Sequence, residues 1–127
     1  MENGESAKRP HERLDVWRDS MALVETVYRL SRTFPDTERF GLTSQVRRCA
    51  VSIPSNIAEG AARRSTAEYL RFLSIARGSL SELDTQIQIA IRLGYVEVPS
   101  GFGSNIDTIF ARITALMNAL EKSGAAR

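Results

Sequence analysis

The hydrophobic positions of the chain recur at α-helical spacing in four separate segments. The first runs from Asp15 to Arg32 and ends before Phe34-Pro35, because the residue preceding a proline is disfavoured in the α region. It carries two adjacent apolar stripes: Trp17, Met21, Val24 and Tyr28 in one, and Val16, Leu23, Val27 and Leu30 in the other. One stripe is enough to pack a helix on a core, so the second predicts a wide core contact or a subunit interface.

The second segment is predicted to begin at Thr43 or Ser44, since either residue can cap a helix, and to end near Gly60. Its inner stripe consists of Leu42, Val46, Cys49, Ile53 and Ile57. Pro54 lies within the segment and removes one backbone hydrogen bond, which bends a helix. Because the apolar spacing continues across Pro54, we predict one kinked helix rather than two.

The third segment begins with Ser65 and Glu68, which are spaced as a capping box, and ends at Gly94. Its apolar residues follow a heptad, typical of helices that pack at a shallow angle. They are Tyr69, Leu73, Ala76, Leu80, Leu83, Ile87 and Ala90. The fourth segment begins at about Ser104, and its inner stripe consists of Ile106, Ile109, Ile113, Leu116 and Leu120.

These segments predict an all-α fold, a single-domain, up-down antiparallel four-helix bundle, because long helices with short connections lie antiparallel. The chain of 127 residues has the length of one domain. We place the bundle at residues 14–121, with a disordered polar tail at 1–13 and a frayed tail at 122–127. No apolar run approaches the ~18 residues of a membrane span, so we expect no membrane partner.

The composition, 43% hydrophobic and 25% charged, is that of a globular protein. Cys49 is the only cysteine, which is consistent with a cytoplasmic location. The net charge is only +2, but lysine occurs only at Lys8 and Lys122, so the basic residues are mostly arginine. The planar guanidinium pairs with carboxylates and with phosphates alike. Interhelical ion pairs are the simpler interpretation of this content, and nucleic-acid contact is the other.

Residues suited to catalysis are scarce. His11 is the only histidine and lies in the expected tail, while Cys49 lies on an inner stripe and is expected to be a buried structural thiol. The carboxylates do not form the Glu-x-x-His pairs of di-iron bundles. The segment Gly101 to Gly103 lacks the strand and lysine of a phosphate loop. We therefore expect a protein that is not an enzyme, with no cofactor and no metal.

Several polar residues lie close to the apolar stripes of the second and third helices. They predict either a structural polar network, which sets the register of the two helices, or contacts to a ligand. The network candidates are Ser52, Asn56, Glu59, Ser79 and Glu82. In an antiparallel pair that turns near Arg64, Glu82 falls opposite Arg47 and Arg48, so we expect a partly buried ion pair there.

The run from Gly41 to Gly60 closely resembles the signature of 23S rRNA-intervening-sequence proteins, a family of four-helix bundles. Further similar elements are Leu14 with Trp17, Phe34-Pro35, Ala76 to Leu83, and Leu93-Gly94-Tyr95. The resemblance covers Leu14 to Leu120. It implies a left-handed up-down bundle, assembly as a ring-like homopentamer, and no attached enzymatic activity. It also implies kinship with the accessory variability determinant of diversity-generating retroelements, a basic pentamer that acts with a reverse transcriptase and nucleic acid.

The arginine content and the resemblance together predict a non-catalytic homo-oligomer that binds RNA or DNA. The candidate phosphate contacts are Arg47, Arg48, Arg63, Arg64 and Arg71. Arg63 and Arg64 are preferred because they lie at a helix junction, where side chains reach outward. The small net charge weakens this interpretation relative to more basic relatives. The alternative is a protein-interaction scaffold, with a protein partner and no nucleic-acid role.

Overall fold

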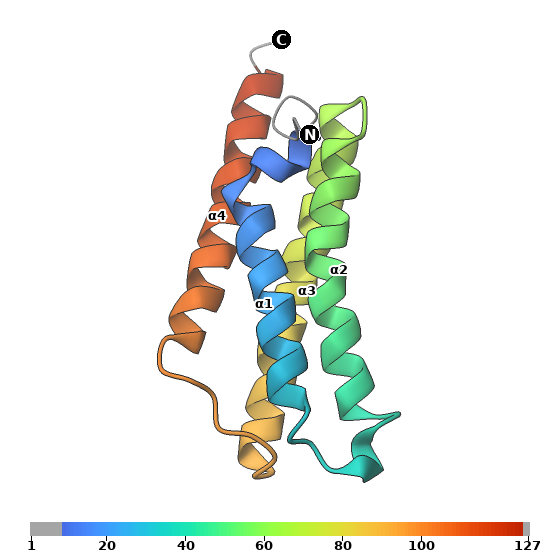
Figure 1. Ribbon diagram of the computed structural model, residues 1–127. Helices are drawn as coiled ribbons and strands as arrows, with labels where there is room; N and C mark the ends of the chain where they lie inside the picture. The colour runs from blue at the N-terminus through green and yellow to red at the C-terminus, as the bar shows by residue number, and fades with distance from the viewer. Residues whose placement is uncertain (1–8, 126–127) are drawn as a thin grey trace, which may run out of the picture.

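The computed structural model describes residues 9–125, and most of them are helical. The four α-helices are α1 (Asp15–Ser31), α2 (Leu42–Ala61), α3 (Thr66–Arg92) and α4 (Phe102–Ala125), with short 3₁₀ helices η1 (Pro10–Arg13) and η2 (Asp36–Glu38). Figure 1 shows the helices running alternately down and up, so that α1 begins and α4 ends at the same end of an elongated bundle. No strand occurs within residues 9–125. The predicted all-α fold of four helices is confirmed, and its left-handed twist stays a prediction.

The helix starts differ in detail from those expected. α2 begins at Leu42, and neither Thr43 nor Ser44 caps it. Instead the Glu38 side chain reaches up from η2, and its Oε1 accepts a hydrogen bond from the Leu42 amide at 3.0 Å. At the start of α3, Ser65 Oγ accepts from the Glu68 amide at 3.1 Å, which forms one half of the expected capping box.

Pro54 lies inside α2 without ending it, and its side chain is buried. The helix is therefore continuous from Leu42 to Ala61, as the unbroken apolar stripe predicts. Pro54 has no backbone N–H, so α2 continues with one backbone hydrogen bond missing at this position. The bend expected at this position stays a prediction.

The core forms where the predicted inner stripes of the four helices meet. Its largest fully buried apolar side chains are Val27, Val46, Ile53, Ile57, Leu73, Leu80, Leu83, Ile87 and Ile113. Of the two stripes on α1, the one with Leu23 and Val27 enters the core. The other stays partly in solvent, because Met21 is 41% and Tyr28 39% exposed. Trp17 and Val24 of this second stripe still pack against the core, so the bundle covers it only in part.

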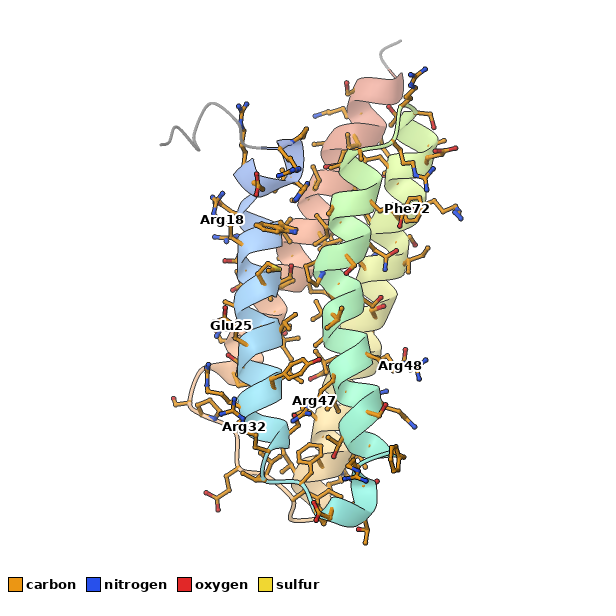
Figure 2. All side chains as sticks on the ribbon, turned by 45° about the vertical axis from the view of Figure 1, so that its right-hand side comes forward. Arg18, Glu25, Arg32, Arg47, Arg48 and Phe72 are labelled. Carbon is orange, nitrogen blue, oxygen red and sulfur yellow. The ribbon has the colours of Figure 1, made fainter. Side chains whose placement is uncertain are left out.

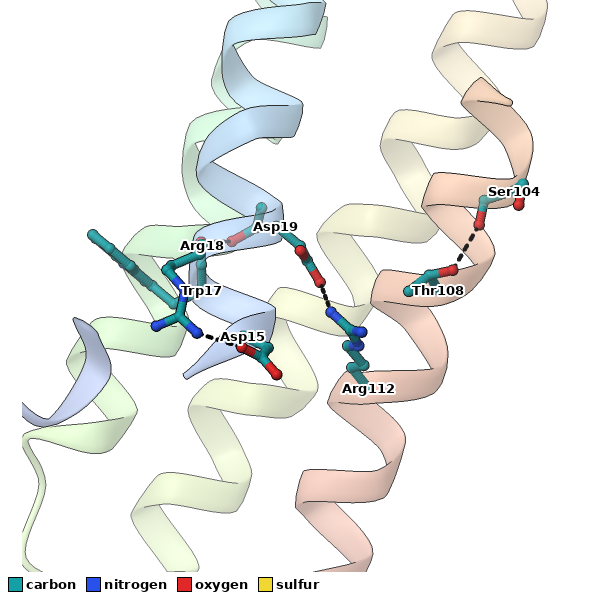
Figure 3. Close-up of polar contacts among 8 residues, drawn as sticks. Asp15, Trp17, Arg18, Asp19, Ser104, Thr108 and Arg112 are labelled. Carbon is teal, nitrogen blue, oxygen red and sulfur yellow. Dashed lines mark hydrogen bonds and ion pairs between the residues drawn. The ribbon is translucent and has the colours of Figure 1, made fainter. Parts of the chain in front are cut away.

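α2 and α3 approach each other closely next to Gly60. A Cβ atom at this buried glycine would lie 3.0 Å from the Cβ of Phe72 and 3.3 Å from the carbonyl oxygen of Tyr69. Only a residue without a side chain lets the two backbones pack this closely. By contrast, α1 and α4 pack less extensively than the other neighbouring helix pairs, and an exposed ion pair between Asp19 and Arg112 joins them (Figure 3).

The two ends of the described chain extend beyond the bundle limits expected from sequence. Residues 10–13, which we placed in a disordered tail, form η1, and the His11 ring meets the Trp17 ring edge-on at 5.0 Å. At the other end α4 continues to Ala125. The remainder of both expected tails lies outside the described residues.

The connections at the opposite end of the bundle are joined through Tyr95. Its hydroxyl donates to Glu38 Oε2 at 3.0 Å, and its carbonyl accepts from Thr33 Oγ1 at 2.7 Å. The hydrogen bond to the Glu38 carboxylate raises the pKa of Tyr95 above the ordinary value of 10.0. Glu38 thus ties the start of α2 to the loop between α3 and α4.

The tight packing at Gly60 generates a stability prediction. Gly60→Ala improves helix propensity by ~1 kcal/mol but forces α2 away from α3, and overpacking of this kind costs ~1–3 kcal/mol. We expect a lower free energy of unfolding, measured by urea denaturation at fixed protein concentration. The matched control is Gly78→Ala in α3, where no atom lies within 4 Å of the new Cβ, and which should stabilise the protein by ~0.5–1 kcal/mol. Equal stability of the two variants would contradict the close approach.

Candidate nucleic-acid interface

Arg47 and Arg48 are neighbours on α2 but point in different directions, as consecutive residues of a helix do. Arg47 lies between α1 and α2, where its Nε donates to Ser31 Oγ at 2.8 Å and its guanidinium lies 4.7 Å from the centre of the Tyr28 ring (Figure 2). Arg48 points away from the bundle and forms no ion pair with the residues that the structure describes. Arg48 is therefore the freer of the two.

The other three candidate arginines lie where α2 turns into α3. Arg63 Nη2 is 2.6 Å from Glu59 Oε2, and Glu68 Oε1 lies 3.9 Å from its Nε. The guanidinium groups of Arg63 and Arg71 lie 4.9 Å and 5.0 Å from the centre of the Phe72 ring. Carboxylates thus partly neutralise Arg63, one of the two preferred candidates.

The expected ion pair of Glu82 with Arg47 or Arg48 is wrong. Within residues 9–125, neither arginine has a carboxylate oxygen within 4.0 Å. Arg47 turns toward α1 and Arg48 toward solvent, whereas Glu82 is exposed and its Oε2 accepts from Gln86 at 3.4 Å. The antiparallel register of α2 and α3 does not bring these charges together, because the side chains of Arg47 and Arg48 leave α2 in directions other than toward Glu82.

The structure joins three of the five residues proposed for the polar network. Ser52 Oγ lies 2.9 Å from Ser79 Oγ, which links the middle of α2 to the middle of α3. Asn56 Nδ2 donates to the carbonyl oxygen of Ser52 at 2.7 Å and to its hydroxyl at 2.9 Å. Glu59 lies outside this cluster with Arg63, and Glu82 lies outside it with Gln86.

Cys49 is a poor nucleophile in this setting. The side chain is only 9% exposed, and burial, together with the nearby Glu82 carboxylate, raises the pKa of the thiol from 9.0 to about 11. The thiol therefore stays protonated at neutral pH, and only the thiolate attacks electrophiles or binds metals. Within residues 9–125 no group of three or more metal-binding side chains is placed to hold an ion.

The arginines contact aromatic rings more often than carboxylates across helices. Within the described chain the ion pair of Arg112 with Asp19 is the one that joins two α-helices. Further guanidinium–ring contacts join Arg39 to Phe40 at 4.9 Å and Arg77 to Phe110 at 4.5 Å. Interhelical ion pairing, the simpler sequence interpretation, therefore accounts for little of the arginine content. Sequence spacing carries no signal for the contacts between helices, such as those of Arg47 with Tyr28 and of Arg77 with Phe110, whereas Arg39 and Phe40 are neighbours in the chain.

One groove on the surface, of about 290 Å³, lies between α1 and α4, and its charged side chains Asp19 and Arg112 neutralise each other (Figure 3). A larger groove, of about 1130 Å³, follows the outer side of α2 and reaches onto α1 and α3. It is lined by Tyr28, Arg39, Phe40, Thr43, Ser44, Gln45, Arg47, Arg48, Cys49, Val51, Ser52, Ser79, Glu82 and Gln86. We call this the α2 groove.

A comparison with known families gives a match over most of the chain. The family model for 23S rRNA-intervening sequence proteins matches residues 12–119, a span that includes α1, α2 and α3 and most of α4. The chain belongs to this family. No curated protein matches the chain significantly. Within residues 9–125 no helix has both the length and the apolar character that crossing a membrane requires.

The raised pKa of Cys49 predicts its reactivity. Thiolate formation sets in only as the pH approaches about 11, so alkylation by iodoacetamide at pH 8 should be at least about tenfold slower than that of a short unstructured cysteine peptide. Between pH 9 and 10 the rate should rise about tenfold, whereas the ionisation of the peptide thiol is already levelling off there. Unfolding in guanidinium should abolish the difference. Rapid alkylation of the folded protein at pH 8 would show an activated thiol instead.

Proposed function

We propose that this protein is a non-catalytic, homo-oligomeric four-helix bundle that binds RNA or DNA through arginines on α2 and α3. A cytoplasmic location belongs to the same proposal, because the one cysteine is a free thiol. The absence of catalysis is proposed because His11 packs on Trp17 and the Cys49 thiol is protonated and buried. Family membership is compatible with this role but does not supply it.

The observation that carries the proposal is the state of three arginines. Arg48, Arg64 and Arg71 are exposed, and none of them forms an ion pair with the described residues. Each guanidinium keeps its full charge and its fork of donors, which suits the phosphates of a nucleic acid. Phosphate contacts supply most of the affinity of sequence-independent binding.

Oligomer formation would offset the small net charge of +2. A ring repeats each arginine cluster once per subunit, and several weak contacts made together can raise the apparent affinity by ~10²–10⁴. The exposed part of α1 around Met21 supports assembly, because an apolar surface that the bundle leaves uncovered is suited to a subunit contact. A pentamer, implied by the family resemblance, is the assembly that we propose.

The alternative function is a protein-interaction scaffold without a nucleic-acid role. It is supported by apolar side chains on the outer surface of α3, where Ile75 is 42% and Ile89 43% exposed. Such residues are common at protein interfaces but also occur singly on ordinary surfaces. The unpaired arginines favour the nucleic-acid role over this one.

Assembly is tested by light scattering after size-exclusion chromatography. We expect several times the chain mass of 14.1 kDa at micromolar concentration, and a monomer would contradict the homo-oligomer. Met21→Lys places a charge on the exposed stripe of α1 and should lower the measured mass. Gln88→Lys, on the exposed side of α3, is the control and should leave the mass unchanged. An unchanged mass in Met21→Lys would show that the interface lies elsewhere.

Nucleic-acid binding is tested by anisotropy titrations of labelled RNA and DNA at several salt concentrations. Affinity should fall steeply with salt and depend little on sequence. Arg48→Ala/Arg64→Ala should weaken binding and shallow the slope of log affinity against log salt by roughly 0.7–0.9 for each phosphate that the variant no longer neutralises.

The control for this titration is Arg18→Ala/Arg112→Ala. It removes the same charge from two guanidiniums that already pair with Asp15 and Asp19, so its slope should stay close to that of the wild type. If the wild type binds neither RNA nor DNA at low salt, the scaffold takes the place of the nucleic-acid role. If both double variants behave alike, net charge rather than these arginines governs binding.

A further inference from the structure

Phe40 is the most exposed large hydrophobic side chain of the described residues. It is 86% exposed and lies between η2 and the first residue of α2, where it contributes almost nothing to the core. The Arg39 guanidinium lies 4.9 Å from the centre of its ring. A single exposed ring has no necessary function, so its surroundings decide what it can do.

Phe40 lies at one end of the α2 groove, and a second arginine–aromatic pair lines the same groove. Tyr28 is 39% exposed, with the Arg47 guanidinium 4.7 Å from the centre of its ring. The hydrogen bond from Arg47 to Ser31 holds this guanidinium in place. Arg48 lines the groove as well and forms no ion pair with the described residues.

We infer that the α2 groove binds single-stranded nucleic acid, with bases stacked on Phe40 and Tyr28 and phosphates held by Arg39 and Arg48. This inference rests on the proposed function and adds the class of nucleic acid and the place of contact. Aromatic faces stack on bases that are already unstacked from one another, which single strands offer and an intact duplex does not. A volume of about 1130 Å³ is larger than most small-molecule pockets and fits an extended ligand.

Charge limits the course of the strand across this groove. Glu82 lines the α3 side of the groove and repels phosphates, whereas Arg39 and Arg47 lie next to Phe40 and Tyr28, and Arg48 points outward from α2. The backbone of the strand therefore follows these arginines and avoids Glu82. Its bases turn toward the two rings.

The inference is tested by anisotropy with fluorescein-labelled oligo(dT) and oligo(U) of 12 nucleotides and a DNA duplex of equal length. Single strands should bind more tightly than the duplex. Phe40→Ala should weaken single-strand binding about tenfold or more, because each base–aromatic stack contributes that much. The salt slope should stay the same, since no phosphate contact is removed. Leu93→Ala, which truncates an apolar side chain that is 56% exposed and outside the groove, should bind as the wild type does.

Phe40→Trp supplies a second readout. It should keep the affinity of the wild type, and oligo(dT) should quench the new indole fluorescence beyond any change at Trp17. Each other outcome has one meaning. If the wild type binds no nucleic acid, the proposed function fails and this inference with it. If the wild type binds but Phe40→Ala is unaltered, the proposed function stands and the groove is the wrong site. If Phe40→Ala changes only the oligomer mass, Phe40 is a subunit contact and the inference is overturned.

Discussion

The close packing of α2 on α3 is the constraint on which the other interactions depend. At one end Gly60 brings the two backbones together beside Phe72, and midway Ser52 and Ser79 share a hydrogen bond. A helix pair held at two levels can neither slide nor rotate without disrupting the packing at one of them. Buried apolar stripes alone would tolerate such shifts, because the hydrophobic effect has no direction.

The placement of arginines around α2 follows from this packing. Because α3 lies close to α2, the Phe72 ring reaches the guanidinium of Arg63, and on the other side of α2 the Tyr28 ring holds Arg47. A guanidinium stacked on a ring keeps its charge and most of its donors, whereas one paired with a carboxylate gives up both to its partner. The net charge of +2 therefore understates what the outer side of α2 presents to a polyanion.

The partly buried polar residues between α2 and α3 offer no comparable chemistry. Cys49 faces the α2–α3 interface with a raised pKa, and Ser52 shares hydrogen bonds with Ser79 and Asn56. These groups contribute to the register of the helices rather than to a reaction. The proposed function therefore rests on the outer surface of the bundle.

The sequence alone determined the four helices, because a 3.6-residue apolar period records which face of each helix is buried, and residues such as Leu83 and Ile113 lie in the core as that period predicts. The sequence also predicted the cluster of Ser52, Asn56 and Ser79. Ser52 and Asn56 share one face of α2, and Ser79 lies opposite them on the antiparallel α3. Only the tertiary structure decided which charged side chains meet partners on other helices. Glu82 accepts from Gln86 and forms no ion pair with Arg48, whereas the Arg63 guanidinium lies over the Phe72 ring of α3. The exposure of Phe40 was also a tertiary outcome. Helical spacing gives the direction in which a residue points from the axis of its own helix. A long side chain can reach partners on several helices, and those partners are in place only once the helices have packed.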